Sequence, residues 1–146
     1  GGETRFDSVK NGLPLINDNT AVVGIHDSAR PFVSLETIKN CYETALLKGN
    51  AVPCISINES MRKISNNVNN SVNRNEFKIV QTPQCFLVEK IKKAFEQNYM
   101  SVFTDDAAVF ESIGENIVLI EGNEENIKIT SPFDLLIAGA LLAQQN

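Results

Sequence analysis

The feature that most constrains the fold is an apolar run near the start of the chain, at residues 20–26 (TAVVGIH). No charged residue interrupts this run before its final histidine, and β-branched residues dominate it. A near-continuous apolar run is typical of a strand covered on both faces, as in the parallel sheets of α/β proteins. Such a strand requires helices on each side, which the rest of the chain must supply.

The following segments supply helices and further strands in alternation. Ser34 is expected to cap an amphipathic helix that ends at Gly49, and residues 51–57 (AVPCISI) form a second apolar strand. The other predicted elements are helices at residues 9–13 (capped by Asp7 or Ser8), 88–97, after a cap at Thr104 and after a cap at Ser131, and strands at residues 117–120 and 126–130. This alternation predicts a Rossmann-like α/β fold with a mainly parallel sheet and helices on both faces.

Residues 59–80 differ in character from the rest of the chain. Apolar residues are sparse there, and four asparagines lie near the middle, between residues 66 and 70. Asparagine tolerates positive φ, so the segment can form two strands joined by an Asn-rich turn. A surface loop without fixed structure is the other interpretation. We treat residues 58–80 as an arm that protrudes from the fold.

Composition argues against several classes of function. The net charge of −5 argues against nucleic acid or a membrane surface as a partner, and the longest apolar stretch, residues 135–143, is too short to span a bilayer. Cys41, Cys54 and Cys85 form no CxxC pair, so we expect free buried thiols rather than a zinc or redox site. Since residues 1–5 also carry no apolar segment of a signal peptide, a cytoplasmic location is expected.

Charged residues that can bind an anion stand at two places. Asp27 and Arg30 directly follow the first predicted strand, and ligands of open α/β sheets bind beyond the carboxyl ends of strands. An ion pair that only fixes the loop is the alternative. Lys128 is the one basic residue in residues 94–146, among nine acidic ones, and it precedes the helix start predicted at Ser131. It is either a solvated charge or a group placed for an anion.

Five segments carry a resemblance to a known family. They are residues 1–13 (GGETRFDSVKNGL), 26–32 (HDSARPF), 74–84 (RNEFKIVQTPQ), 104–107 (TDDA) and 126–135 (NIKITSPFDL). In content and order they resemble the motifs of cytidylyltransferases that activate methylerythritol phosphate or ribitol phosphate. The last two segments are more similar to the 2-C-methyl-D-erythritol 4-phosphate cytidylyltransferase family. Ser28 and Ser60 stand where that family commonly has Ala and Thr.

The resemblance implies roles for the matched residues. Three of them are expected to be catalytic: Asp27 lies at the substrate and a metal ion, Arg30 at the substrate phosphate, and Lys128 at the reacting phosphoryl group. The positions that match nucleotide-binding residues are Gly2, Glu3 and Ser8. The positions that match substrate-binding residues are Ser60, Arg74, Thr82 and Thr104. His26 is interpreted as a strand-end residue without a catalytic role.

The resemblance also implies a reaction. The phosphate of a sugar-alcohol phosphate, 2-C-methyl-D-erythritol 4-phosphate, would attack the α-phosphorus of CTP with Mg²⁺ or another divalent cation, releasing pyrophosphate and a CDP-linked isoprenoid precursor of the non-mevalonate pathway. A phosphate monoester has a second pKa of about 6, so this nucleophile needs no general base at neutral pH. The arm would cross to the partner in a homodimer, where Ser60 and Arg74 would serve the neighbouring site. The alternatives are a ribitol-5-phosphate cytidylyltransferase and a dimerising fragment without activity.

One part of the family pattern is missing from these 146 residues. The family begins with a strand and a glycine-rich loop that wraps the CTP phosphates, and the sequence contains no match to them. We therefore expect residues 1–146 to be a partial nucleotidyltransferase domain, truncated at its N-terminus and inactive alone.

Overall fold

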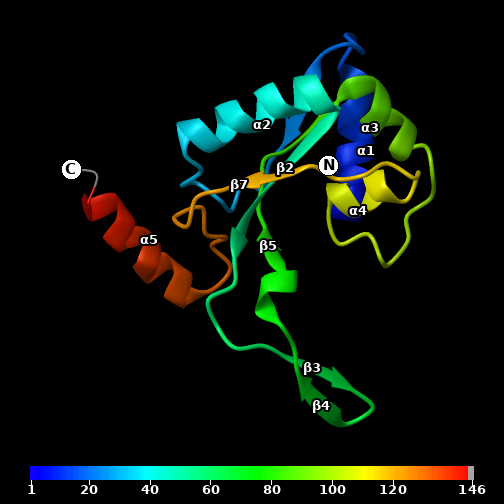
Figure 1. Ribbon diagram of the computed structural model, residues 1–146. Helices are drawn as coiled ribbons and strands as arrows, with labels where there is room; N and C mark the ends of the chain where they lie inside the picture. Colours follow the sequence, from blue (N-terminus) through cyan, green and yellow to red (C-terminus); the bar gives the residue numbers. More distant parts are fainter. Residues whose placement is uncertain (145–146) are drawn as a thin grey trace.

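Strand β2 (Asn50–Ser56) is the centre of the sheet, because its residue Cys54 pairs with a strand on each side. The computed structural model describes residues 1–144. On one side, β2 pairs with β5 (Lys78–Val80) and β6 (Gln84–Leu87), and on the other with β7 (Leu119–Glu121). Strand β6 also pairs with β1 (Val22–Ile25), which completes the sheet (Figure 1).

The α/β class is confirmed, but the sheet is mixed rather than mainly parallel. Only the β2–β7 pairing in the described chain is parallel, and the β1–β6, β2–β5 and β2–β6 pairings are antiparallel. Three strands that were predicted, β1, β2 and β7, do run in the same direction. The correction comes from β6, which was not predicted and which lies between β1 and β2 with the opposite direction.

Helices cover both faces of the sheet, as predicted. Neighbouring residues of a strand point to opposite faces, so apolar strand residues form a core with helices on each face. Val52 and Phe86 face a core built with helices α1 (Arg5–Gly12), α3 (Val88–Ala94) and α4 (Asp106–Glu111). Their neighbours Ala51 and Cys85 face a smaller core that includes Cys41 of helix α2 (Leu35–Lys48). Figure 1 shows α2 on one side of the sheet and α1, α3 and α4 grouped together at one end of the molecule.

Local capping signals explain where most helices begin. Helix α2 (Leu35–Lys48) begins after Ser34, whose hydroxyl accepts a hydrogen bond from the Thr37 amide, and ends at Gly49 with φ 95°. Helix α5 (Pro132–Gln144) begins after Ser131, whose amide donates to the Asp134 carboxylate at 2.8 Å. Both caps were predicted. Helix α3 (Val88–Ala94) follows β6 without a side-chain cap.

Two helix starts and one strand differ from the prediction. Helix α1 (Arg5–Gly12), followed by a 3₁₀ turn at Leu13–Leu15, is capped by Thr4 and not by Asp7 or Ser8, because Thr4 and Asp7 form a reciprocal capping box. Helix α4 (Asp106–Glu111) is capped by Asp105 and not by Thr104. Residues 126–130 form no strand, although the Ile129 amide donates to the Ala29 carbonyl at 2.8 Å.

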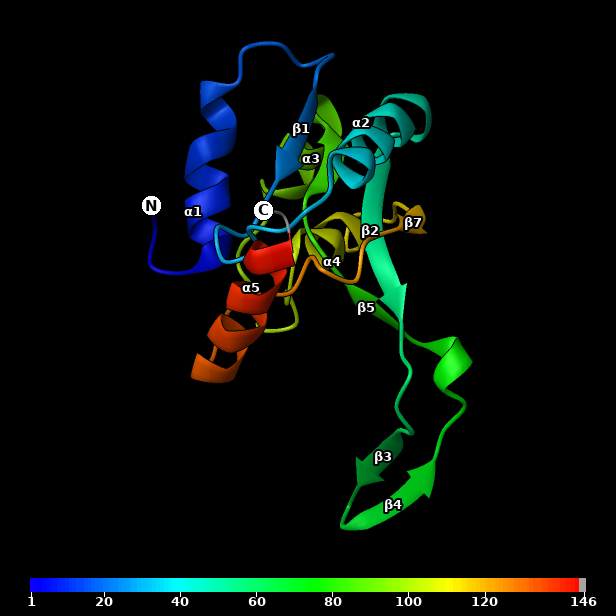
Figure 2. The same cartoon turned by 90° about the vertical axis from the view of Figure 1, so that its left-hand side faces the viewer.

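The arm is an ordered hairpin, which decides between the two interpretations of residues 59–80. Strands β3 (Arg62–Ser65) and β4 (Val68–Ser71) pair antiparallel, and Asn66 and Asn67 form the turn with φ of 49° and 63°. A 3₁₀ turn at Arg74–Glu76 then leads into β5. Figure 2 shows the hairpin extending well away from the body of the protein.

Strands β5 and β6 lie end to end along β2, with a bulge relative to β2 at residues 81–84, the last of which is the first residue of β6. Cys54 pairs with Val80 and Ala51 pairs with Cys85, so two residues of β2 lie opposite four residues of the bulged strand. The bulge contains a cis peptide bond before Pro83. It directs the side chains of Gln81 and Thr82 toward the candidate site, as described below.

Two predictions from composition can be compared with the described residues. All three cysteines are free and buried, as expected. No helix among residues 1–144 has the length and apolar character needed to cross a membrane.

Candidate active site

A cavity of about 230 Å³ lies beyond the carboxyl end of β1. Five residues predicted for the site line it together, although they are far apart in the sequence: Asp27, Arg30, Thr82, Thr104 and Lys128. Its remaining lining residues were not predicted: Arg5, Val80, Gln81, Gln84 and Asp105. The cavity therefore gathers side chains from the β1 end, the 81–84 bulge, the start of α4 and the segment before α5.

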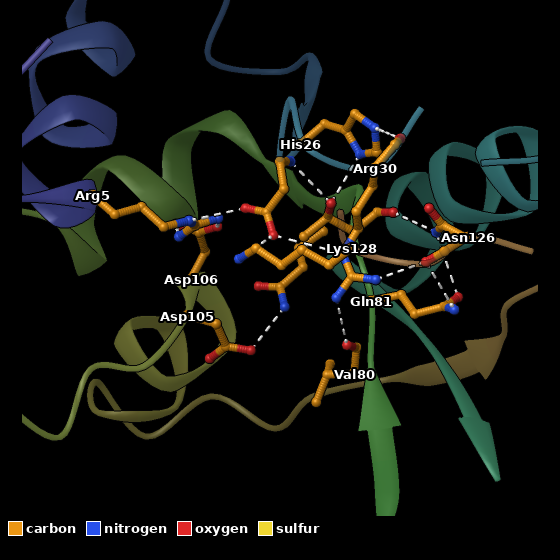
Figure 3. Close-up of polar contacts among 12 residues, drawn as sticks. Arg5, His26, Arg30, Val80, Gln81, Asp105, Asp106, Asn126 and Lys128 are labelled. Atoms are coloured by element: carbon orange, nitrogen blue, oxygen red, sulfur yellow. Dashed lines mark hydrogen bonds and ion pairs between the residues drawn. The ribbon is translucent and has the colours of Figure 1, made fainter. Parts of the chain in front are cut away.

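Asp27 is surrounded by cations at the centre of this site. Its Oδ2 lies 3.0 Å from Lys128 Nζ and 3.6 Å from Arg30 Nε, and its Oδ1 lies 3.3 Å from Arg5 Nε. Arg5 and Lys128 therefore contact different oxygens of this carboxylate, and Figure 3 labels both cations. Burial alone would raise the pKa of Asp27, but Lys128 and Arg5 outweigh burial and hold the pKa below its ordinary value. Asp27 is therefore ionised at neutral pH.

A hydrogen-bonded chain fixes the backbone at Asp27. The Asp27 amide donates to Thr82 Oγ1 at 3.0 Å, and Thr82 Oγ1 lies 2.9 Å from His26 Nδ1. His26 Nε2 lies 3.0 Å from the Arg30 carbonyl, which can only accept, so Nε2 is the donor of that hydrogen bond. His26 thus holds the loop and the Thr82 hydroxyl in place, which agrees with its interpretation as a structural residue.

The guanidinium of Arg30 is held by two backbone carbonyls. Nη1 donates to the Asn126 carbonyl at 2.7 Å, and Nη2 donates to the Val80 carbonyl at 3.4 Å. Asn126 is fully buried, and its side-chain amide donates to the Thr82 carbonyl at 2.9 Å. Gln81, also buried, donates to the Asn123 carbonyl at 2.9 Å. Asn126 and Gln81 therefore connect the bulge to the segment that carries Lys128, and Figure 3 shows the contacts between these two residues.

Lys128 was predicted either as a solvated charge or as a group placed for an anion. Its side chain is 45% exposed, and its ammonium group lies at the cavity with Asp27 as its partner. The structure therefore places Lys128 within the site instead of on a remote surface. Arg30 likewise pairs with Asp27, yet both also line the cavity, so the loop-fixing and ligand-binding interpretations are compatible.

A second cavity of about 320 Å³ adjoins the first. Ser8, one of the predicted nucleotide-binding residues, lines it together with Ser28 and His26. Arg5 and Asp27 line both cavities. The two cavities therefore share the Arg5–Asp27 ion pair in their lining.

The other predicted residues lie elsewhere. Gly2 and Glu3 are exposed before helix α1, and an added side chain at Gly2 would collide with Asp7. Ser60 and Arg74 are exposed in the arm, where the Arg74 guanidinium donates to the Asn58 carbonyl. The described chain does not bring these four residues to the cavity.

The residues missed from sequence are those with partners far along the chain. Arg5 stands in the first matched segment and Asp106 in the fourth, so a signal was present for both, but neither was assigned a role. Asn126 begins the last matched segment. Gln81 lies in the third matched segment, just before the predicted Thr82, and it was likewise assigned no role.

A metal ion was predicted at Asp27. Mg²⁺ usually takes one or two carboxylates, with phosphates and waters completing six oxygen ligands. Both oxygens of Asp27 face cations, and residues 1–144 contain no group of three His, Cys, Asp or Glu side chains placed to hold a metal. These donors do not fit a metal ion held by the protein alone, and the metal-binding role of Asp27 stays a prediction.

The fold and the site together define a class of protein. A mixed α/β sheet that gathers arginine and lysine at a cavity beyond a strand end is suited to binding phosphorylated ligands. The family model for 2-C-methyl-D-erythritol 4-phosphate cytidylyltransferase matches residues 1–144. The chain therefore belongs to the 2-C-methyl-D-erythritol 4-phosphate cytidylyltransferase family.

Individual relatives agree with this assignment. The chain is 51% identical to a 2-C-methyl-D-erythritol 4-phosphate cytidylyltransferase of Bacteroides fragilis over 142 residues, covering 97% of this chain and 64% of the relative. The crystal structure of the Thermus thermophilus enzyme of that name has a TM-score of 0.85 at 32% identity, covering 98% of this chain and 71% of that one. The Francisella tularensis structure has a TM-score of 0.85 at 33% identity, covering 95% and 68%. The chain thus spans about 64% of the length of the curated relatives it matches.

Proposed function

We propose that the full-length protein carrying this sequence transfers the cytidylyl group of CTP to 2-C-methyl-D-erythritol 4-phosphate, releasing pyrophosphate, in the non-mevalonate route to isoprenoid precursors. The observation that carries the proposal is the cavity at which Arg5, Arg30 and Lys128 converge on Asp27 and which Thr82 and Thr104 also line. Membership of the family supports the choice of nucleotide and acceptor.

The geometry suits a reaction that needs positive charge and positioning more than proton transfer. The acceptor phosphate is already an anion at neutral pH, so no general base is required. Arg30 and Lys128 would bind the acceptor phosphate and offset the charge that develops at the α-phosphorus of CTP. Asp27 keeps the cationic groups together before substrates arrive, so little rearrangement is needed during the reaction. Thr82 and Thr104 would orient the polyol.

Further charge is proposed to come with the nucleotide. CTP is expected to enter as its complex with Mg²⁺ or another divalent cation, held chiefly by phosphate oxygens, which agrees with the lack of a protein-held metal group among the described residues. Gly2, Glu3 and Ser8 are proposed to contact the cytosine and ribose from the α1 side. We further propose that the 146-residue chain is a partial domain and is inactive alone, and that the cytoplasm is its location, where free thiols persist.

The test measures pyrophosphate release by the full-length protein with CTP and either 2-C-methyl-D-erythritol 4-phosphate or ribitol 5-phosphate. We expect kcat/KM to be at least about 100-fold higher with the methylerythritol substrate, because the longer, unbranched chain of ribitol phosphate would not place its hydroxyls opposite the groups that orient the branched polyol. Preference for ribitol phosphate would assign the related activity instead. No transfer to either acceptor would refute the proposal. Activity of residues 1–146 alone would refute the proposal that this chain is incomplete.

The arm is proposed to serve the site of a second subunit in a homodimer. It carries Arg62, Lys63 and Arg74 in a protein of net charge −5, and every residue of strands β3 and β4 is exposed. The planar guanidinium of Arg74 can donate two parallel hydrogen bonds to a phosphate, and Ser60 would bind the substrate beside it. A two-fold dimer would give two equivalent shared sites.

Two inactive full-length variants, Asp27→Ala and Arg74→Ala, test this arrangement. In a mixed dimer, one site would carry both lesions and the other neither. Subunit exchange should therefore restore up to about half of the activity per heterodimer. Heterodimers that form and stay as inactive as their parents would place Arg74 in its own subunit's site.

A further inference from the structure

Arg5 occupies a position for which the proposed reaction alone assigns no role. It is the first residue of α1, directly after the Thr4 cap. Its guanidinium donates two hydrogen bonds to Asp106, from Nη1 to Oδ1 at 2.8 Å and from Nη2 to Oδ2 at 2.5 Å. Asp106 is at the start of α4 and its side chain is only 1% exposed. Such a two-pronged pair fixes the orientation of the arginine as well as its charge.

The fixed guanidinium makes a third contact, with Asp27. Arg5 Nε donates to Asp27 Oδ1 at 3.3 Å, while Lys128 Nζ lies 3.0 Å from Asp27 Oδ2. The resulting sequence of contacts runs from Asp106 through Arg5 and Asp27 to Lys128. Its four members come from four segments: the start of α4, the start of α1, the end of β1 and the segment before α5. A displacement of Arg5 would therefore reach Lys128 through a single carboxylate.

The Arg5–Asp27 ion pair lies between the two cavities of the site. Arg5 and Asp27 line both the cavity that contains Thr82 and Lys128 and the cavity that contains Ser8. In the proposed function the first receives the acceptor phosphate and the second lies on the nucleotide side. The reacting phosphate and the α-phosphorus would meet near the boundary. A small misplacement at such a point costs up to about 100-fold in rate.

We propose that Arg5 is a positioning residue: held by buried Asp106, it fixes the Asp27 carboxylate at the boundary of the two cavities, and Asp27 in turn orients Lys128 toward the reacting phosphates. This proposal rests on the proposed function. The competing explanation is an ion pair that only fastens α1 to α4, which would affect stability and leave the rate of the folded enzyme unchanged.

The main test uses the full-length pair variant Arg5→Gln/Asp106→Asn. It removes both charges yet leaves two amides that can bond each other, so no carboxylate is buried without a partner. We expect kcat to fall about 10- to 100-fold, with the KM for CTP changed less than about threefold. The matched control is Lys90→Met, which removes a Lys90–Glu115 pair of 2.9 Å that lies outside both cavities, and kcat should stay within about twofold.

A double-mutant cycle determines whether Arg5 acts through Asp27. In an Asp27→Asn background, the Arg5→Gln/Asp106→Asn change should lower kcat by less than about threefold more, because the carboxylate it positions is already gone. An equal loss in both backgrounds would overturn the proposal. So would a folded pair variant with wild-type kcat. If the pair variant does not fold, Arg5→Lys keeps the charge but cannot form both hydrogen bonds to Asp106. The folded Arg5→Lys enzyme should show a several-fold lower kcat, even if its Tm also falls. Wild-type kcat in that variant would also overturn the proposal.

A crystal structure of the variant separates this proposal from the proposed function. If the wild-type full-length protein transfers no cytidylyl group, the proposed function fails. The positioning role is then judged on the coordinates alone. An Asp27 carboxylate that moves away from Lys128 in the pair variant supports it, and one that keeps its place refutes it.

Discussion

Replacing Lys128 by Met should separate a catalytic charge from a structural one. The change keeps an unbranched side chain of similar length and removes the ammonium group that lies 3.0 Å from Asp27 Oδ2. If Lys128 acts on the phosphates, the loss should appear in kcat. If it only partners Asp27, the loss should appear in stability.

The structure sets the expected size of each effect. Lys128 is 45% exposed, so its pair with Asp27 is screened by water and contributes about 1 kcal/mol or less to folding. For a protein of this size that corresponds to about 2–4 °C in Tm. Loss of one electrostatic stabiliser of a transition state lowers kcat by about 100-fold, or about 2.7 kcal/mol. The catalytic effect should therefore exceed the effect on stability.

The assay measures pyrophosphate release and thermal melting of the full-length variant beside Lys90→Met. Lys90 is a close match for Lys128, since it is 40% exposed and lies 2.9 Å from Glu115. The control should lose a similar amount of Tm and keep its kcat. A Lys128→Met enzyme with kcat within about threefold of wild type would refute the reasoning.

The sign of the pH dependence provides a second check. The lowered pKa of Asp27 means that its pairing stabilises the fold above the ordinary carboxyl pKa of about 3.9, and that this contribution disappears as the pH falls through the lowered value. The Tm of Lys128→Met should be lower than that of wild type at pH 7. This difference in Tm should disappear as the pH falls below about 3.9. A difference that widens in acid would contradict the assigned pairing.

Two further predictions concern the supports of the site. Asn126→Ala should destabilise the protein by about 1–3 kcal/mol, because the Thr82 carbonyl would lose the hydrogen bond of 2.9 Å that it accepts from the buried Asn126 amide. Urea unfolding measures this loss, and an unchanged midpoint would show that the carbonyl finds another donor. Asp134→Asn should lower the Tm at pH 7 and lower it less at pH 2. Hydrogen bonds from the Thr130 and Ser131 amides lower the pKa of Asp134, and its contribution is lost as the carboxylate becomes protonated. An equal loss at both pH values would show that the charge of Asp134 is irrelevant to the start of α5.

The elements that were predicted from sequence are those fixed by local interactions. Ser34 and Gly49 delimit α2 through contacts within a few residues, and the arm turn uses Asn66 and Asn67 because they accept positive φ. Strand β6 has no such signal. It is four residues long, and the following helix has no side-chain cap, so only its pairing with β1 and β2 defines it.

The same distinction applies to the candidate site. Asp27, Arg30 and Lys128 stand out through their places beside predicted strand and helix ends and through matched motifs. The supporting contacts cross long stretches of chain, such as Arg5 with Asp106 and Asn126 with Thr82. No periodicity or spacing predicts which distant carboxylate an arginine will meet. Those pairs are set by how the helices pack on the sheet.

The bulge between β5 and β6 constrains chain length more than it constrains residue type. Removing or adding one residue in residues 81–84 would exchange the faces of all following β6 side chains, because side chains alternate along a strand. Phe86 would then point at the small core beside Cys41, and Cys85 would leave a void beside Phe110. Single-residue insertions and deletions should thus be absent here among relatives, although substitutions can occur. The exposed arm turn at residues 66–67 has no such restriction and should vary in length.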